Sequence, residues 1–229
     1  MGKAKWCVMA FCIFVSLVMT PKVSTAEWFA DLYFGEASTQ SADVSVDISS
    51  SSLGFMRQYT TTKKVDFDDS FMFGGRVGYY FESLPWVGFA LDLSYFQADG
   101  KNVDNDIVPI SLLLMLRWPL FKSENFPKGR LQPYTGIGPG FFLADSKADF
   151  RPAVPERVSG SSTDVGIDIR FGLAWQFHKR MALFGEYRHT DFSIDLKQTD
   201  ILYGLAGSEE KMKTGLTTNH FLMGISYRF

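Results

Sequence analysis

The last fifteen residues, GLTTNHFLMGISYRF from Gly215 to Phe229, decide the fold. Bulky apolar residues recur at every second position over the final nine, at Phe221, Met223, Ile225, Tyr227 and Phe229. Polar or small residues, including His220, Gly224, Ser226 and Arg228, fall between them, and a period of two with one apolar face predicts a β-strand. That apolar face matches the length of a tilted strand that crosses a bilayer. The pattern therefore predicts a lipid-facing strand that closes a transmembrane barrel.

The first 26 residues have the layout of a secretory signal peptide. Lys3 and Lys5 precede an uncharged apolar run from Trp6 to Met19, and small residues at 24–26 offer a cleavage site. The run is short for a spanning helix, although an uncleaved anchor is the alternative. We therefore expect a cleaved signal peptide over 1–26 and one outer membrane barrel domain over 27–229.

Removal of that segment would change the composition of the chain. Both cysteines, Cys7 and Cys12, lie in it, so the mature protein would have no disulfide and no thiolate metal site. Three of the 23 basic residues also lie in it, which leaves 20 against 25 acidic ones and a net charge of −5. This balance argues against nucleic acid as a partner.

Seven further segments alternate in the same way as the closing one. They lie at 28–36, 70–82, 86–96, 107–120, 131–144, 164–177 and 181–192. The breaks between the eight predicted strands run alternately long and short, and the longest, 37–69, predicts a large mobile loop with a short hairpin around 53–59. A soluble β-sandwich could share the composition but has no reason to sort its breaks. The predicted fold is an all-β, eight-stranded, antiparallel up-and-down transmembrane β-barrel.

The tryptophans give an independent indication of the membrane boundary. If the first strand rises from the periplasm, all four tryptophans beyond the signal peptide fall at periplasmic strand ends: Trp28, Trp86, Trp118 and Trp175. Indole rings prefer the boundary between headgroups and acyl chains. We expect these residues to form a periplasmic aromatic girdle.

The face opposite the apolar one carries charges of both signs. Five basic and four acidic residues are expected there: Asp31, Arg76, Asp92, Arg117, Asp168, Arg170, Glu186, Arg188 and Arg228. Side chains just fill the interior of an eight-stranded barrel, so these charges should pair across the lumen and plug it. We therefore predict no wide aqueous pore.

Two segments carry a family resemblance. The segment EYRHTDF at 186–192 and the ending MGISYRF at 223–229, within the eight-strand layout, resemble the outer membrane β-barrel superfamily that includes opacity-type porins and the OmpA and OmpX barrels. The resemblance implies a Gram-negative outer membrane protein with both termini in the periplasm. It also implies that the barrel assembly machinery reads the terminal strand, with Phe221, Met223, Ile225, Tyr227 and Phe229 as the signal.

The barrel fold leaves three classes of function open. We expect a structural or surface-interaction protein with long extracellular loops and no enzymatic activity. A narrow porin for small solutes is the alternative, and a lipid A-modifying hydrolase is the third. The expected partners are outer membrane lipid, lipopolysaccharide and an extracellular ligand that meets the loops, and the protein is expected to be a monomer.

The enzymatic alternative depends on His189. The sequence His189-Thr190-Asp191 faintly resembles the His-x-Ser pattern of outer membrane lipid A deacylases. A serine-type hydrolase needs a hydroxyl polarised by a histidine, but alternation points Thr190 away from His189. A rim histidine near lipopolysaccharide headgroups is the favoured interpretation. His178 and His220 lie on separate segments without companions at ligand spacing, so no metal site and no cofactor are predicted.

Overall fold

A computed structural model describes residues 27–52, 55–100, 103–148, 158–198 and 208–229, and these form ten β-strands. The strands are β1 (Glu27–Thr39), β2 (Ala42–Ser52), β3 (Phe55–Val65), β4 (Ser70–Tyr80), β5 (Val87–Gln97), β6 (Val103–Arg117), β7 (Leu131–Ala148), β8 (Val158–His178), β9 (Met181–Gln198) and β10 (Ser208–Arg228). No helix among the described residues is long and apolar enough to cross a membrane. The signal peptide predicted for 1–26 lies outside the described residues.

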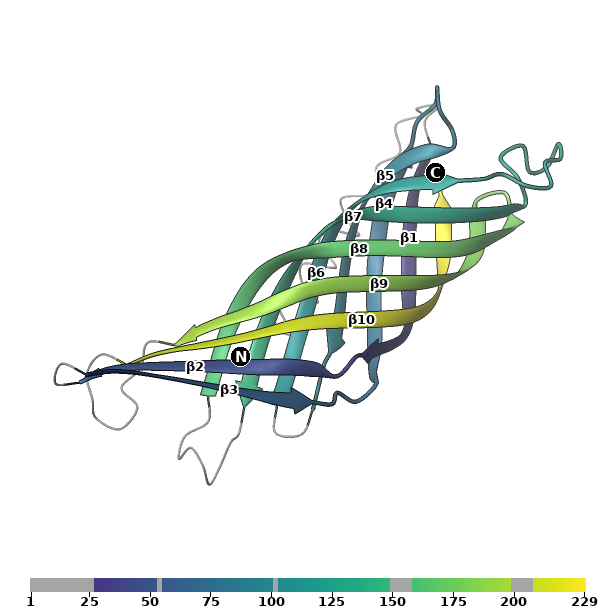
Figure 1. Cartoon of the computed structure of the whole chain (residues 1–229). Helices are drawn as coiled ribbons and strands as arrows, with labels where there is room; N and C mark the ends of the chain where they lie inside the picture. The colour runs from purple at the N-terminus through teal and green to yellow at the C-terminus, as the bar shows by residue number, and fades with distance from the viewer. Residues whose placement is uncertain (1–26, 53–54, 101–102, 149–157, 199–207) are drawn as a thin grey trace, which may run out of the picture.

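Eight of the strands close into a barrel. The order is β1-β4-β5-β6-β7-β8-β9-β10, every pair is antiparallel, and β10 returns to pair with β1. The closing pair includes Ala30 opposite Tyr227 and Phe34 opposite Met223. The predicted fold class, an eight-stranded antiparallel up-and-down barrel, is thus confirmed, and Figure 1 shows the strands tilted steeply around it.

The alternation places apolar side chains outside and polar ones inside. On β1, Trp28, Leu32 and Phe34 are exposed, whereas Asp31 and Tyr33 are buried in the lumen. The same division holds on β10, where Met223 is exposed and Leu222 is buried. A barrel in water could not leave such a continuous apolar surface uncovered, so the outer face requires a lipid environment.

The long predicted loop 37–69 is wrong for most of its length. β1 continues to Thr39, and β2 and β3 form a hairpin of two eleven-residue strands. β2 pairs with the first part of β10, from Val44 opposite Thr214 to Ser50 opposite Ser208, where β1 has already ended. Apolar residues do alternate with polar ones from Ala42 to Ile48, but the Ser-, Thr- and Asp-rich composition of the whole segment suggested a loop. In the structure this strand pairs through its backbone with the edge of β10 that β1 leaves free. Figure 1 shows this hairpin continuing the sheet beyond the barrel beside β10.

The same end of the barrel carries the other long extensions. β7 continues to Ala148, β8 starts at Val158, β9 reaches Gln198 and β10 starts at Ser208, each several residues beyond its predicted limit. We call this end, where β1 leads to β2 and β9 to β10, the loop end. The opposite end, where Lys179 and Arg180 alone join β8 to β9, is the turn end.

Candidate functional site: the barrel lumen

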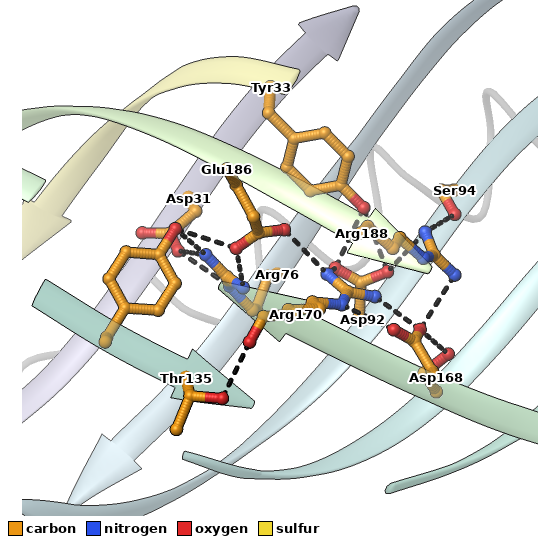
Figure 2. A network of polar contacts seen from close by, with 12 residues as sticks. Asp31, Tyr33, Arg76, Asp92, Ser94, Thr135, Asp168, Arg170, Glu186 and Arg188 are labelled. Carbon is orange, nitrogen blue, oxygen red and sulfur yellow. Dashed lines mark hydrogen bonds and ion pairs between the residues drawn. The ribbon is translucent and has the colours of Figure 1, made fainter. Parts of the chain in front are cut away.

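Arg170 on β8 is the centre of a buried polar cluster in the lumen. Its Nε and NH2 donate to the two carboxylate oxygens of Asp168 at 2.9 and 2.8 Å. Its NH1 lies 2.7 Å from Asp92 Oδ2 on β5 and 3.4 Å from Glu186 Oε1 on β9. All four side chains are fully buried. One guanidinium therefore joins three carboxylates from three strands (Figure 2).

Arg76 on β4 extends the cluster toward the turn end. Its Nε donates to Asp31 Oδ2 at 2.8 Å, and its NH1 donates to Glu186 Oε2 at 2.7 Å. The Tyr134 hydroxyl donates to the same Glu186 oxygen at 2.7 Å. Glu186 thus bridges Arg76 and Arg170 from opposite sides, as Figure 2 shows.

Arg188 on β9 completes the cluster toward the loop end. Its NH2 lies 2.9 Å from Asp168 Oδ2 and its NH1 lies 3.7 Å from Asp92 Oδ1. NH1 also donates to Ser94 Oγ at 2.9 Å. We call the seven charged residues the lumen charge network: Asp31, Arg76, Asp92, Asp168, Arg170, Glu186 and Arg188.

Hydroxyl groups outside the predicted set of charges belong to the same cluster. The Tyr33 hydroxyl contacts both carboxylate oxygens of Asp92, at 2.9 and 2.8 Å, and Ser111 donates to Asp168 Oδ2 at 2.6 Å. Their inward position in the alternation was the available signal. Gly74 and Gly172 make room for tyrosine rings, because a Cβ at either position would collide with Tyr33 or Tyr134.

Arg117 and Arg228, which were expected in the same set, form a separate cluster at the turn end. Both contact Glu27, with Arg117 NH2 at 2.5 Å from Oε2 and Arg228 NH1 at 2.7 Å from Oε1. Lys128, from the connection after β6, lies 3.0 Å from Glu27 Oε2. Glu27 was missed because it precedes the first predicted strand by one residue.

A cavity of about 20 Å³ lies beside the two clusters. Asp31, Arg76 and Arg228 line it, together with the rings of Phe29 and Tyr80. This volume holds about one water molecule. The described lumen is therefore packed with side chains at this level, with no space for a column of water.

On the loop side of the charge network, the lumen also holds large buried apolar side chains. The rings of Phe142 on β7 and Phe192 on β9 stack with their centroids 4.0 Å apart and an interplanar angle of 2°. Phe96, Ile107 and Leu216 are also fully buried there. We call these five residues the apolar layer. Alternation indicates that these residues point inward, but it does not indicate that they meet in one layer.

The predicted outward-facing residues lie where alternation placed them. The four tryptophans, Trp28, Trp86, Trp118 and Trp175, are about half exposed and lie within three residues of the turn-end limits of their strands. Phe221, Met223, Ile225, Tyr227 and Phe229 all lie exposed along the outer face of β10 and its last residue. The roles of these two groups, in the membrane interface and in assembly, stay predictions.

His189 and Thr190 lie on opposite faces of β9. The outward His189 donates from Nδ1 to Asn219 Oδ1 at 2.8 Å, because an amide oxygen can only accept. Thr190 is buried in the lumen, where its hydroxyl lies 3.2 Å from His220 Nε2. The two residues therefore do not form a histidine–hydroxyl pair. Among the described residues, no group of three or more His, Cys, Asp or Glu side chains is arranged to hold a metal ion.

A comparison with known protein families decides the family. Residues 10–229 match the family model described as outer membrane protein beta-barrel domain. The chain belongs to this family. Membership places the protein in the bacterial outer membrane. A search of curated proteins found no significant match.

Solved structures of outer membrane proteins match this chain at low sequence identity. The outer membrane protein OprG from Pseudomonas aeruginosa is 18% identical with a TM-score of 0.55, over 88% of this chain and 95% of that one. Neisserial surface protein A is 15% identical with a TM-score of 0.48, over 91% and 100%. The outer membrane protease OmpT from Escherichia coli is 8% identical with a TM-score of 0.42, over 92% and 99%. At such identities, likeness to OprG establishes the fold and leaves the activity open.

Proposed function

We propose that the protein is a closed, non-conducting outer membrane barrel that presents an extended β-sheet at the cell surface. The observation that carries this proposal is the packing of the lumen. Arg170 bonds to three carboxylates in its middle, and the stacked Phe142 and Phe192 fill it toward the loop end. A barrel filled in this way serves as a rigid membrane anchor, and its function lies in what it carries outside the membrane.

The loop end is the extracellular end in this proposal, and both termini are periplasmic. Outer membrane barrels have short periplasmic turns and longer extracellular loops. Here β2 and β3 extend the sheet beyond β1 at the loop end, beside the first residues of β10. The backbone edge of β3 that faces away from β2 gives an extracellular ligand a strand on which to pair.

Surface proteolysis tests this orientation. A protease cleavage site is inserted between Thr39 and Ala42 in one variant and between His178 and Met181 in another. We expect intact cells to be cut at the first site only. The second site lies in the two-residue turn between β8 and β9, which faces the periplasm in this orientation and is out of reach of an external protease. Cleavage of intact cells at the second site alone would reverse the orientation.

Deletion of residues 42–65 tests the surface role. The eight barrel strands pair without β2 and β3, so the shortened protein should still fold and insert. We expect it to lose binding of cells to extracellular matrix or to host surfaces, with an unchanged amount of barrel in the membrane. Full binding by the shortened protein would contradict a role for the hairpin.

The channel alternative needs a continuous polar path through the lumen. Buried ion pairs and the apolar layer both oppose such a path, since charged solutes would have to displace Arg170 and Arg188 from their carboxylates. Liposome swelling in small sugars and amino acids distinguishes the alternatives. We expect swelling no faster than in protein-free liposomes, and fast swelling would favour the channel.

A further inference from the structure

An apolar hollow on the outer face of the barrel is centred on Gly185. It has a volume of about 530 Å³ and lies across β8, β9 and β10, with Phe171, Leu173, Tyr187, Phe221 and Met223 around it. Gly185 lies opposite Leu173 on one neighbouring strand and Met223 on the other. A glycine inside a strand weakens it and often marks a place where a ligand approaches the backbone closely. The nearest atom to a Cβ at Gly185 would be Leu222 O at 4.0 Å, so a larger side chain fits without strain.

A second apolar hollow of about 530 Å³ adjoins the first one. Met223 lines both, and Leu32, Phe34, Phe73 and Ile225 line the second. These side chains belong to the outward face of β4, β1 and β10. At this depth the solvent of the outer face is hydrocarbon, so two adjoining grooves suit a lipid that carries several acyl chains.

Three polar side chains lie at the edge of the first hollow that is nearer the loop end. Tyr187 and His189 follow Gly185 on the same face of β9, opposite Phe221 and Asn219 of β10. The Tyr187 hydroxyl and His189 Nδ1 both donate to Asn219 Oδ1 at 2.8 Å. Their donation fixes the Asn219 amide, whose nitrogen then points its hydrogens elsewhere. In the hydrogen bonds of the described residues, neither that nitrogen nor His189 Nε2 takes part.

We infer that this surface binds lipid A, the phosphorylated and multiply acylated glycolipid of the outer leaflet. Acyl chains would lie in the two hollows, and a phosphate would accept hydrogen bonds from the Asn219 amide nitrogen. The inference rests on the proposed orientation, which puts the loop end in the outer leaflet. It also gives His189 a positioning role in place of a catalytic one, because His189 Nδ1 holds the Asn219 amide oxygen.

Two carboxylates limit the conditions for binding. Glu36 lies opposite Phe221, and Asp191 follows His189 on the same face of β9, and both are exposed. They would repel a phosphate that carries no counterion, so binding is measured with Mg²⁺ present.

Native mass spectrometry of the purified barrel with added lipid A tests the inference. Gly185→Leu fills the first hollow, and we expect about threefold to tenfold less bound lipid A, the range for loss of packing and polar contacts in a membrane. Asn219→Asp keeps the acceptor for Tyr187 and His189 but removes the amide hydrogens, and we expect a similar loss. The matched control is Gly215→Leu, at an exposed outward glycine on the neighbouring strand β10, outside both hollows and with no atom within 4 Å of a Cβ.

The outcomes separate this inference from the proposed function. Lipid A binding that falls in Gly185→Leu and Asn219→Asp but not in Gly215→Leu supports the site. Equal lipid A binding by the parent and the three variants overturns it. Phosphatidylglycerol is the comparison lipid, and a loss of its binding equal to the loss of lipid A binding also overturns the inference. Surface proteolysis of intact cells reports the orientation independently, so a correctly oriented barrel with unchanged lipid A binding would refute the site alone.

Discussion

Two layers of the lumen close the barrel by different chemistry. The lumen charge network fills the middle with guanidinium–carboxylate contacts, whereas the apolar layer fills the loop side with stacked phenylalanine rings. A charged layer holds specific strands together, because each ion must keep its partners once it is out of water. An apolar layer depends on volume and shape instead. The comparison shows that inward positions of a small barrel can be filled by either means.

The largest expected effect is in the charged layer. Arg170→Met keeps much of the side-chain volume but leaves Asp92, Asp168 and Glu186 without their shared cation. Removing one partner of a buried ionic cluster costs about 3–5 kcal/mol. Urea unfolding of the barrel in detergent should show this loss of stability. The control is Arg180→Met, at an exposed arginine. An equal loss of stability in the two variants would show that the lumen charge network does not stabilise the barrel more than a surface arginine does.

The apolar layer should respond through volume. Phe142→Ala deletes one of two stacked rings and leaves a cavity next to Phe192, at a cost of about 3–4 kcal/mol. Phe141→Ala on the outward face is the matched control, since Phe141 is about half exposed and lipid can fill its place. The same unfolding experiment compares them. A larger loss for Phe141→Ala would show that the layer does not pack the lumen.

A smaller effect tests the hydroxyls that surround the charges. Tyr33→Phe removes the hydroxyl that contacts both oxygens of Asp92 and keeps the ring. A hydrogen bond to a charged group contributes about 1.5–3 kcal/mol. Tyr79→Phe, on the outward face of β4, should change the free energy of unfolding by less than about 0.5 kcal/mol. If both variants have the same free energy of unfolding as the parent, the Tyr33 hydroxyl does not contribute to the polar cluster and only the ring fills space.

The smallest effect lies outside both layers, at Asp99 beyond the end of β5. Partial burial raises the pKa of its carboxyl, and the negative charges of Asp104, Asp106 and Asp68 add to the increase. A carboxyl with a raised pKa favours the folded loop end in its protonated form. This contribution is therefore lost as the pH rises from the ordinary aspartate pKa to the raised one.

An NMR titration of the Asp99 carboxyl checks this direction. Asp104→Asn should lower the pKa of Asp99, because it removes one neighbouring negative charge. A pKa for Asp99 below the ordinary aspartate value would contradict the account.

The sequence predicted the barrel better than it predicted the contents of the lumen. Period-two alternation revealed all eight barrel strands and the inward direction of residues such as Arg170 and Asp168, because side-chain direction depends only on position along a strand. It did not reveal which inward residues meet. Arg117 and Arg228 reach Glu27 rather than the network, and this depends on strand stagger, which no single strand encodes.

Strand ends at the loop end were the other gap. In β2 the alternation of apolar and polar residues covers only Ala42 to Ile48 and lies within a Ser- and Asp-rich segment, and β3 has no such alternation. The hairpin pairs with the part of β10 that is left without a neighbour once β1 has ended at Thr39. This free edge exists only in the assembled sheet. The outward patch of Tyr187, His189 and Asn219 likewise becomes visible only when β9 and β10 are placed side by side.

Planar bilayer recording of the purified barrel tests the closed lumen most directly. With side chains packed through the charge network and the apolar layer, the parent protein should show no discrete ion conductance at moderate voltage, and Arg180→Met should behave in the same way. Stable conductance steps from the parent protein, with ion selectivity that changes in Arg170→Met, would show that ions pass through the network and would contradict the account.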